Sequence, residues 1–232
     1  MKTVVLISAD AEWRVVKSLL SDSEPHTTPL GEYLETSLRN RGLTFFHGGW
    51  GRVSASATTQ YVIDRMQPDL LVNLGTCGGF EGRIARGTII LVERTVIYDI
   101  VEQMADAAEA IEHYSTTLDL RWLPEADPLP VVRGLLVSGD RDIIPQDIPE
   151  LVRKFDAVAA DWESGAIAWV AERNRQPLLI LRGVSDLVGS SGGEAYGDYP
   201  LFMSRTKDIM ARLIAVLPDW LAGIDPQRLV RQ

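Results

Sequence analysis

Three acidic residues stand where apolar segments of the chain begin or end, and their chemistry is the first clue to function. Glu12 follows the apolar run 3–8, Glu163 opens a helical segment of small apolar residues, and Asp186 closes the run 177–186. Carboxylates that cluster in a partly buried cleft repel one another, so their proton affinities separate and one of them stays protonated near neutral pH. Such a cluster supplies both a general acid and a general base.

Each acid also has a structural interpretation. Glu12 at the front of a helix interacts favourably with the helix dipole, Asp186 is suited to capping a turn, and Asp161 could cap the helix that Glu163 precedes. A functional interpretation of the acids is favoured over a structural one, because three carboxylates, Arg182 and several glycines are predicted to lie at the same edge of one sheet. In open α/β sheets the ligand crevice lies at that edge, outside the carboxyl ends of the strands.

The elements that position these residues follow from short apolar runs alternating with segments of helical spacing. Strands are predicted over residues 3–8, 43–49, 69–75, 88–93, 131–139 and 177–186. Helices are predicted over residues 11–20, 53–66 and 164–173, with a terminal helix from about residue 202 that ends between residues 218 and 223. This alternation indicates an α/β fold with a mostly parallel or mixed sheet covered by helices. The acidic segment 100–127 is irregular, and a helix followed by a surface excursion is expected there.

Composition excludes several classes of protein. With 46% hydrophobic and 24% charged residues and no linker or repeat, residues 1–232 are expected to form one domain. A net charge of -9 disfavours nucleic acid as a partner. The apolar run before Asp10 is too short for a signal peptide or a membrane span, so we expect a cytoplasmic protein with no membrane partner. With only Cys77 and three scattered histidines, no disulfide, metal or cofactor is expected.

Four motifs occur in an order and spacing that resemble the nucleoside phosphorylase and nucleosidase superfamily, and most closely the 5′-methylthioadenosine/S-adenosylhomocysteine nucleosidases. They are "NLGTCGG" (73–79), "LLVSGD" (135–140), "AADWESGAIAWVA" (159–171) and "LILRGVSDL" (179–187). The resemblance runs from residue 3 to about residue 215 and is weakest between residues 94 and 130. It implies a three-layer α/β/α fold with a central mixed, partly barrel-like sheet, a small-molecule nucleoside substrate, and a homodimer in which the partner borders the 5′ pocket.

The resemblance also implies roles for the three acids. Cleavage of an N-ribosidic bond leaves positive charge on the ribose, so the site needs an acid at the purine and anions at the sugar. By resemblance, Asp186 protonates N7 of the purine with Ser185 orienting it, and Glu12 deprotonates the attacking water. Glu163 accepts hydrogen bonds from the sugar hydroxyls.

Further residues are predicted to contact the substrate. Trp162 stands where the family usually has Met under the sugar ring; stacking on the ribose and a place in the core are both open. Arg182 either orients the water and Glu12 or forms a structural ion pair. The predicted substrate-binding set is Thr76, Gly78, Trp162, Arg182, Ser185, Trp50 and Ile143.

Hydrolysis is favoured over phosphorolysis. The related phosphorylases present arginines to phosphate, after the first strand and two residues before the glycine of the third-strand loop. Here those positions hold "ADAEW" (9–13) and Asn73. The arginines that could replace them as phosphate ligands are Arg14 and Arg52. Glu12 near the phosphate position would also repel an anion. A phosphate-dependent purine nucleoside phosphorylase is the alternative.

The base and the 5′ group are less constrained. Asp142, shortly after "SGD", stands where adenine-specific members have an aromatic residue that stacks on the base. Either Trp50 or Tyr98 covers the purine, or the natural base or 5′ substituent differs, as in a futalosine-type nucleosidase. A non-catalytic nucleoside sensor is a further alternative, because fold alone does not determine activity. An apolar wall of the pocket, or else a surface loop, is expected from Tyr196, Tyr199 and Phe202.

Overall fold

The structure is a computed structural model that describes residues 1–229. Its strands are β1 (Thr3–Ile7), β2 (Pro25–Thr28), β3 (Gly31–Leu38), β4 (Arg41–His47), β5 (Leu70–Phe80), β6 (Ile89–Ile97), β7 (Ser115–Thr117), β8 (Val132–Ser138), β9 (Ala157–Asp161), β10 (Leu178–Gly189) and β11 (Gly192–Gly193). Its α-helices are α1 (Asp10–Leu19), α2 (Arg52–Met66), α3 (Ala107–His113), α4 (Ile148–Phe155), α5 (Ser164–Arg173) and α6 (Tyr199–Ala222). Two short 3₁₀ turns cover Pro145–Asp147 and Pro226–Arg228.

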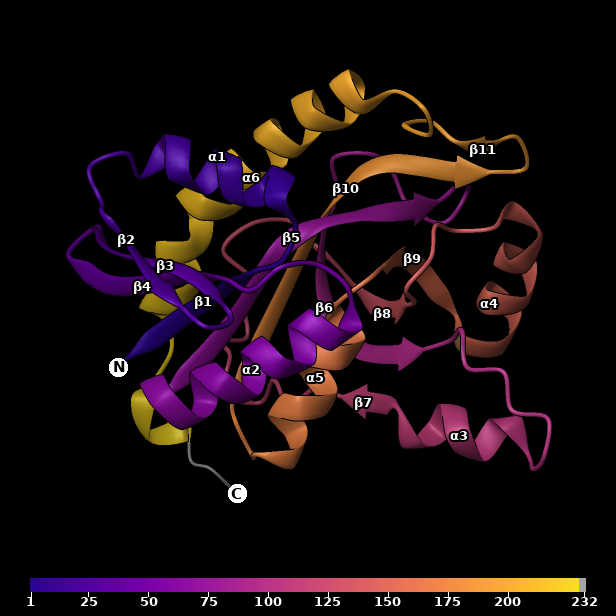
Figure 1. Cartoon of the computed structure of the whole chain (residues 1–232), viewed down its shortest axis with the longest axis horizontal. Helices are drawn as coiled ribbons and strands as arrows, with labels where there is room; N and C mark the ends of the chain where they lie inside the picture. Colours follow the sequence, from indigo (N-terminus) through magenta and orange to yellow (C-terminus); the bar gives the residue numbers. More distant parts are fainter. Residues whose placement is uncertain (230–232) are drawn as a thin grey trace.

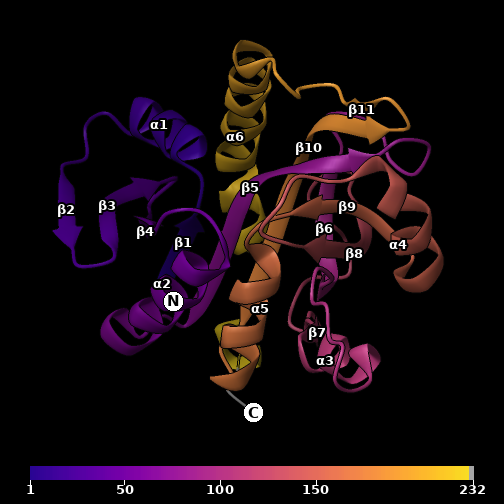
Figure 2. The ribbon, with the colours of Figure 1, turned by 45° about the vertical axis from the view of Figure 1, so that its right-hand side comes forward.

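One mixed sheet joins these strands in the order β11-β10-β6-β8-β9-β5-β1-β4-β3-β2, and β7 pairs with β6. The two longest strands, β5 and β10, also pair with each other in parallel, from Leu71 opposite Leu178 to Phe80 opposite Val188. This extra pairing closes β5, β10, β6, β8 and β9 into a five-stranded barrel-like unit, in which β5 and β10 run together through the centre of the molecule (Figure 2). The expected mixed, partly barrel-like sheet is confirmed.

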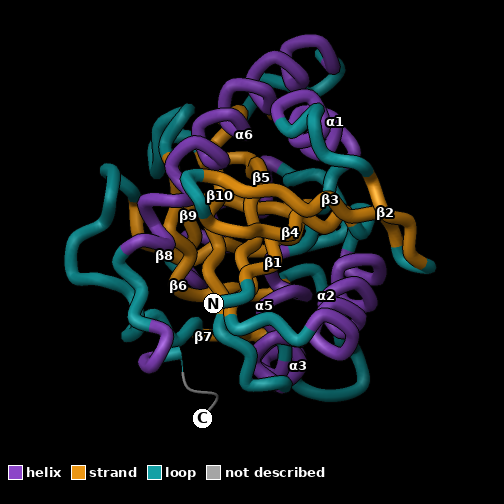
Figure 3. The backbone as a smooth tube through the Cα atoms, turned by 90° about the vertical axis from the view of Figure 1, so that its left-hand side faces the viewer, coloured by secondary structure: helices purple, strands orange, loops and turns teal. Residues whose placement is uncertain are grey.

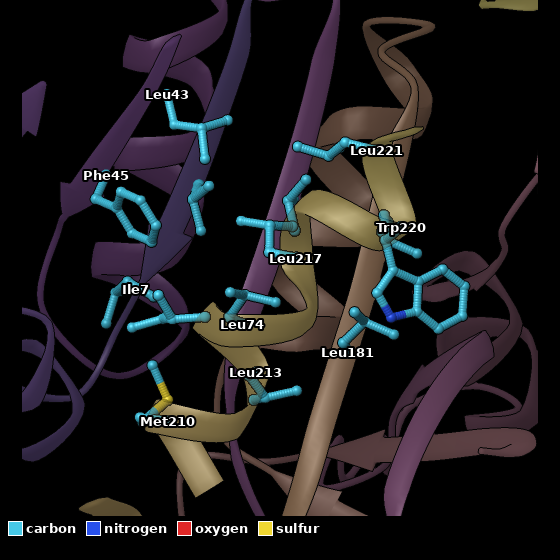
Figure 4. Packing of buried hydrophobic residues seen from close by; sticks show 14 of the residues in the cluster. Ile7, Leu43, Phe45, Leu74, Leu181, Met210, Leu213, Leu217, Trp220 and Leu221 are labelled. Carbon is cyan, nitrogen blue, oxygen red and sulfur yellow. The ribbon is translucent and has the colours of Figure 1, made fainter. Parts of the chain in front are cut away.

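Helices cover both faces of this sheet. Helices α1 and α6 pack on one face and α2 and α5 on the other, as the cartoon and the tube view show (Figures 1 and 3). Met210, Leu213 and Leu217 on α6 are fully buried at helical spacing. They pack against Leu74 of β5 and Leu181 of β10, so α6 holds these two strands in place (Figure 4).

Several elements differ from the sequence-based expectations. Strands β2 and β3 form an exposed edge with few buried residues, so no apolar run marks them. The short β9 and the helix α4 were also missed. The predicted strands 69–75 and 177–186 are too short, because β5 continues through the glycine-rich segment to Phe80 and β10 to Gly189. The barrel-like pairing of β5 with β10 is what extends them.

Helix α6 begins at Tyr199 rather than near residue 202, and Asp198 caps it by accepting a hydrogen bond from the Leu201 backbone. It ends at Ala222, within the predicted range. Segment 100–127 contains α3 followed by the short β7. Among residues 1–229 there is no helix with the length and apolar character needed to cross a membrane.

Candidate active site

A cavity of about 610 Å³ lies where α1, β5, β10 and the start of α5 meet. Its walls include nine of the ten residues that the sequence pointed to: Glu12, Trp50, Thr76, Gly78, Ile143, Trp162, Glu163, Ser185 and Asp186. Arg182 is the exception, because its side chain lies behind the wall and only 1% of it is exposed. The structure therefore brings the three predicted acids into one cavity.

Arg182 is held on strand β10 by a set of buried acceptors. Its Nε donates to Ser164 Oγ at 2.9 Å, and its Nη2 donates to Asn73 Oδ1 at 2.8 Å. Nη2 also lies 2.9 Å from Asp161 Oδ2 in a buried ion pair. Burial opposes the charge of the guanidinium, but the surrounding carboxylates outweigh it and raise the pKa of Arg182. The guanidinium is a fixed positive charge beneath the acids.

Glu12 lies in the first turn of α1 and reaches across to β5. Its Oε1 accepts hydrogen bonds from the Thr76 backbone N–H at 2.6 Å and from the Thr76 hydroxyl at 2.9 Å. Arg182 Nη1 is 3.9 Å away. Burial raises the pKa of Glu12, which the charge of Arg182 and the Thr76 donors partly offset. A raised pKa suits a general base that must take up a proton.

Gly75 makes room for this contact. A Cβ added at Gly75 would lie 1.9 Å from Arg182 Nη1 and 2.8 Å from Glu12 Oε1. Any side chain at this position would force apart the acid and the guanidinium. Gly75 is therefore needed because it lets the side chains of Arg182 and Glu12 come close to the backbone. It does not form a turn, because its segment is part of β5.

Glu163 occupies the residue before α5, where the chain leaves β9. Its Oε1 accepts a hydrogen bond from the Gly51 backbone N–H at 3.0 Å, and its Oε2 lies 3.8 Å from Arg182 Nη2. Burial, followed by repulsion from Asp161, raises the pKa of Glu163 to about 8. At neutral pH in the free protein this carboxyl group is mainly protonated.

The small residues of α5 explain why an acid heads this helix. A Cβ at Gly165 would lie 2.8 Å from Ile97 Cγ1 and 3.0 Å from Ser138 Cβ, so the helix packs closely on β6 and β8. That close packing places the amino-terminal edge of α5, with Glu163, against the cavity.

Asp186 lies on β10 next to a bulge, since the pairing with β5 shifts register between Val184 and Asp186. Its Oδ1 accepts a hydrogen bond from Ser185 Oγ at 2.7 Å, and the same hydroxyl is 3.2 Å from the Cys77 carbonyl oxygen. Burial raises the pKa of Asp186, which the Ser185 hydrogen bond partly offsets. The arrangement orients a carboxyl group that holds its proton more firmly than an exposed aspartate does.

Aromatic side chains form much of the remaining wall. The rings of Trp50 and Trp162 lie with centroids 5.4 Å apart at 49°, and Trp162 faces the cavity rather than the core. Trp50 is 58% exposed at the rim. Tyr98, the other residue considered as a cover for the purine, is not part of the wall. The wall also includes Tyr196, Tyr199 and Phe202.

The importance of three residues of the site was not predicted from the sequence. Asp161 accepts a hydrogen bond from the Ser164 backbone at 3.1 Å, as a helix cap would, but it is also the principal ion-pair partner of Arg182. From the sequence, Asn73 was significant only because it stands where the phosphorylases have an arginine. In the structure its amide oxygen accepts a hydrogen bond from the Arg182 guanidinium. Arg141 also lines the cavity and pairs with Asp147. Only a motif position, in "ADWE" and "NLGTCGG", could have indicated the first two.

The two arginines considered as phosphate ligands lie elsewhere. Arg52 donates to both oxygens of Asp99, at 2.5 and 2.9 Å, and also to Asp140. Arg14 reaches Tyr199 Oη at 3.4 Å, near the surface. Neither guanidinium lines the cavity.

The Phosphorylase superfamily profile matches residues 3–217. The chain belongs to this superfamily, which confirms the resemblance. A 5′-methylthioadenosine/S-adenosylhomocysteine nucleosidase of Maridesulfovibrio salexigens is 29% identical and aligns with 84% of this chain and 90% of its own length. The enzyme of that name from Bacillus subtilis is 22% identical, covering 86% of this chain and 91% of its own.

Solved structures show the same fold. The apo form of Arabidopsis thaliana 5′-methylthioadenosine nucleosidase superposes with a TM-score of 0.79 at 22% identity, covering 97% of this chain and 98% of that one. A Neisseria meningitidis 5′-methylthioadenosine/S-adenosylhomocysteine nucleosidase in complex with methylthio-immucillin-A gives a TM-score of 0.72 at 21% identity, covering 93% and 97%. Futalosine hydrolase of Helicobacter pylori gives 0.77 at 17% identity, covering 94% and 97%.

Proposed function

We propose that this protein is a nucleosidase that hydrolyses the N-glycosidic bond of a purine nucleoside, with 5′-methylthioadenosine and S-adenosylhomocysteine as substrates. The observation that carries the proposal is the meeting of Glu12, Glu163 and Asp186 around one cavity of about 610 Å³. The names of the relatives support the same substrates. A cavity of this size suits a small molecule.

In this mechanism each acid acts at a different part of the nucleoside. Asp186, oriented by Ser185, donates its proton to N7 of the purine, so the base leaves as a neutral molecule. Glu12, held by Thr76, takes a proton from the attacking water. Glu163 accepts hydrogen bonds from the ribose hydroxyls as positive charge develops on the sugar. General acid and base contributions of this kind are each worth about 10² to 10⁴ in rate.

The charge of the cavity supports water as the nucleophile. Five acidic side chains line it, Glu12, Asp142, Asp161, Glu163 and Asp186, and the one cationic side chain in its described wall is Arg141. Arg141 is engaged with Asp147, and Arg182 behind the wall is engaged with Asp161. A phosphate dianion entering this cavity would meet net repulsion.

The direct test is release of free base, followed by chromatography. Methylthioadenosine, adenosylhomocysteine, futalosine and unsubstituted purine nucleosides are each incubated with the protein, with and without phosphate. We expect base and free sugar from the first two without phosphate. Strict dependence on phosphate would establish phosphorolysis, preference for futalosine would reassign the substrate, and tight calorimetric binding without product would indicate a sensor.

We propose a homodimer, joined through an apolar surface beside the cavity. Val53, Val101 and Met104 are 83%, 79% and 97% exposed, and Val53 and Ile100 line a second hollow of about 460 Å³. Contiguous exposed apolar side chains are typical of interfaces. Sedimentation should show a dimer, and Met104→Glu should yield monomers; a wild-type monomer would exclude the proposal.

We propose that residues 1–232 form a single domain, since the superfamily profile spans residues 3–217 and the hydrophobic clusters of the described chain pack on one sheet. A cytoplasmic location is also proposed, and the free, buried thiol of Cys77 is compatible with it. Fractionation of cells would test the location.

A further inference from the structure

A single buried guanidinium faces three buried carboxylates in this site. Arg182 Nη2 is 2.9 Å from Asp161 Oδ2, and Glu163 Oε2 lies 3.8 Å from the same nitrogen. Glu12 Oε1 is 3.9 Å from Nη1. One guanidinium cannot pair closely with three carboxyl groups, and the hydrogen bonds show that its partner is Asp161.

Asp161 is surrounded by donors on both oxygens. Ser138 Oγ lies 2.6 Å from Oδ1 and accepts from the Gly165 backbone, so its proton is directed at Asp161. Ser164 Oγ lies 2.5 Å from Oδ2 and accepts from Arg182 Nε, so its proton is directed there too. An oxygen pair that receives only donors is the environment of an ionised carboxylate.

Glu163 has a different environment. Its Oε1 accepts one backbone hydrogen bond, from Gly51, whereas its Oε2 has no hydrogen-bond donor among the described residues. The distance of 3.8 Å to Arg182 exceeds that of a hydrogen bond. Because Glu163 lines the cavity, Oε2 is the oxygen available to a ligand.

We propose that Asp161 is a positioning residue for the sugar: as the closest counter-ion of Arg182, it keeps the guanidinium from hydrogen-bonding to Glu163 and leaves Glu163 Oε2 free for the ribose hydroxyls. This inference rests on the proposed function. Without the charge of Asp161, Nη2 would turn to Glu163 and close the gap of 3.8 Å. The oxygen would then be lost to the sugar.

The charges that face Glu163 also set its titration. They come from Asp161 on β9, Arg182 on β10 and Glu12 on α1, and within residues 1–229 the Gly51 N–H is the one hydrogen-bond donor to Glu163. Asp161→Asn removes a repulsive charge and strengthens the attraction to Arg182, and both changes lower the pKa of Glu163. Changes of this type move a pKa by about 1 to 3 pH units.

The experiment compares wild type with Asp161→Asn, Asp161→Glu and Ser138→Ala. For each protein, kcat/KM is measured between pH 5 and 9 for a ribonucleoside and its 2′-deoxy form. In Asp161→Asn we expect the rise of kcat/KM with pH to move to lower pH by at least about one unit. The preference for the ribonucleoside should fall by about tenfold or more, the worth of a hydrogen bond to a charged group. Asp161→Glu keeps the charge and should keep both properties.

Ser138→Ala is the matched control. It removes a hydrogen bond to Asp161 without changing any charge, so the pH profile should stay in place even if the protein is less stable. A folded Asp161→Asn variant with an unchanged pH profile and unchanged preference for the ribose would overturn the inference. If Asp161→Asn does not fold, loss of the ribose preference in Asp161→Glu would overturn it, and retention would support it.

Failure of the proposed function is a separate outcome. If the wild type releases no base from any purine nucleoside, the nucleosidase proposal fails, but the role of Asp161 is still decided by NMR titration of the Glu163 side-chain carbon. A lower pKa of Glu163 in Asp161→Asn supports the inference, and an unchanged pKa contradicts it.

Discussion

Glu163→Gln should make the free protein more stable at high pH. In the unfolded chain a glutamate ionises near its ordinary pKa of 4.5, whereas in the folded protein the pKa of Glu163 is about 8. Between these pH values the folded protein holds a proton that the unfolded chain has released, so the free energy of unfolding falls as pH rises. The contribution of the Glu163 proton to the free energy of unfolding is fully present below pH 4.5 and is lost progressively up to about pH 8.

The magnitude follows from that difference. The step from 4.5 to 8 is 3.5 pH units, and at about 1.36 kcal/mol per unit it corresponds to about 5 kcal/mol. Glutamine keeps the acceptor for the Gly51 N–H and carries no charge, so it escapes this cost. The variant should therefore exceed the wild type by about 3 to 5 kcal/mol at pH 8 and match it closely at pH 5.

The assay is urea denaturation at pH 5 and pH 8, followed by circular dichroism. Glu125→Gln, an exposed acid, serves as a control for the loss of one negative charge at the surface. Comparing variant with wild type at each pH cancels the titration of acids that lie away from Glu163, because they titrate alike in both proteins. An equal difference in stability at the two pH values would refute the argument that burial and Asp161 hold a proton on Glu163.

Three further substitutions test the site. Asp186→Asn should lower kcat by about 10² to 10⁴ with little change in KM, because only the proton donor is lost; steady-state release of base measures both, and normal turnover would exclude Asp186 as the acid. Asp142→Phe should lower KM for methylthioadenosine by about 2- to 12-fold, the worth of one aromatic pair, if the base lies against this wall; an unchanged KM would place the base elsewhere. Gly75→Ala should lower the free energy of unfolding by about 1 to 3 kcal/mol in urea titrations and remove most activity. Gly42→Ala, where a Cβ meets nothing within 4 Å, should do neither.

The meeting of Glu12 and Glu163 could be predicted because each stands at an element boundary, whereas the predicted strand 177–186 ended at Asp186 although β10 continues to Gly189. Glu12 follows β1 at the start of α1, and Glu163 lies between β9 and α5. In a sheet of this class such boundaries fall at one edge. The order of the motifs added the fold family, so the placement of the acids required no knowledge of side-chain geometry.

The two central strands show what such reasoning leaves out. Glycine normally weakens a strand, so the predicted strand 69–75 ended at the first glycine of "GTCGG". In the structure these glycines lie inside the strand, where Gly75 accommodates Arg182 and Glu12, and Gly79 faces Val184 and Ile84. Close contact between side chains that are distant in sequence leaves no periodic pattern in the sequence. A glycine-rich turn and a glycine-rich, tightly packed strand therefore have the same local composition.

The partner of Arg182 was unpredictable for a related reason. The sequence left open whether this side chain serves Glu12 or a structural ion pair, and the distances answer in favour of Asp161, at 2.9 Å against 3.9 Å for Glu12. A difference of 1 Å decides which acid is neutralised. This difference in distance depends on how β9, β10 and α1 pack together. The spacing of apolar residues in the sequence does not specify that packing.

The excess of negative charge has a consequence for catalysis. If Glu12, Asp161 and Glu163 were all ionised, they would outnumber the guanidinium of Arg182, and burial makes this imbalance costly, so in the free protein a proton stays on Glu163. A neutral nucleoside brings no charge to relieve it. On the proposed mechanism the sugar becomes positive only as the bond to the purine breaks, so the attraction to these acids is strongest in the transition state. An interaction that grows at that point raises kcat rather than ground-state binding, and this explains why the site keeps acids that lower the stability of the free protein.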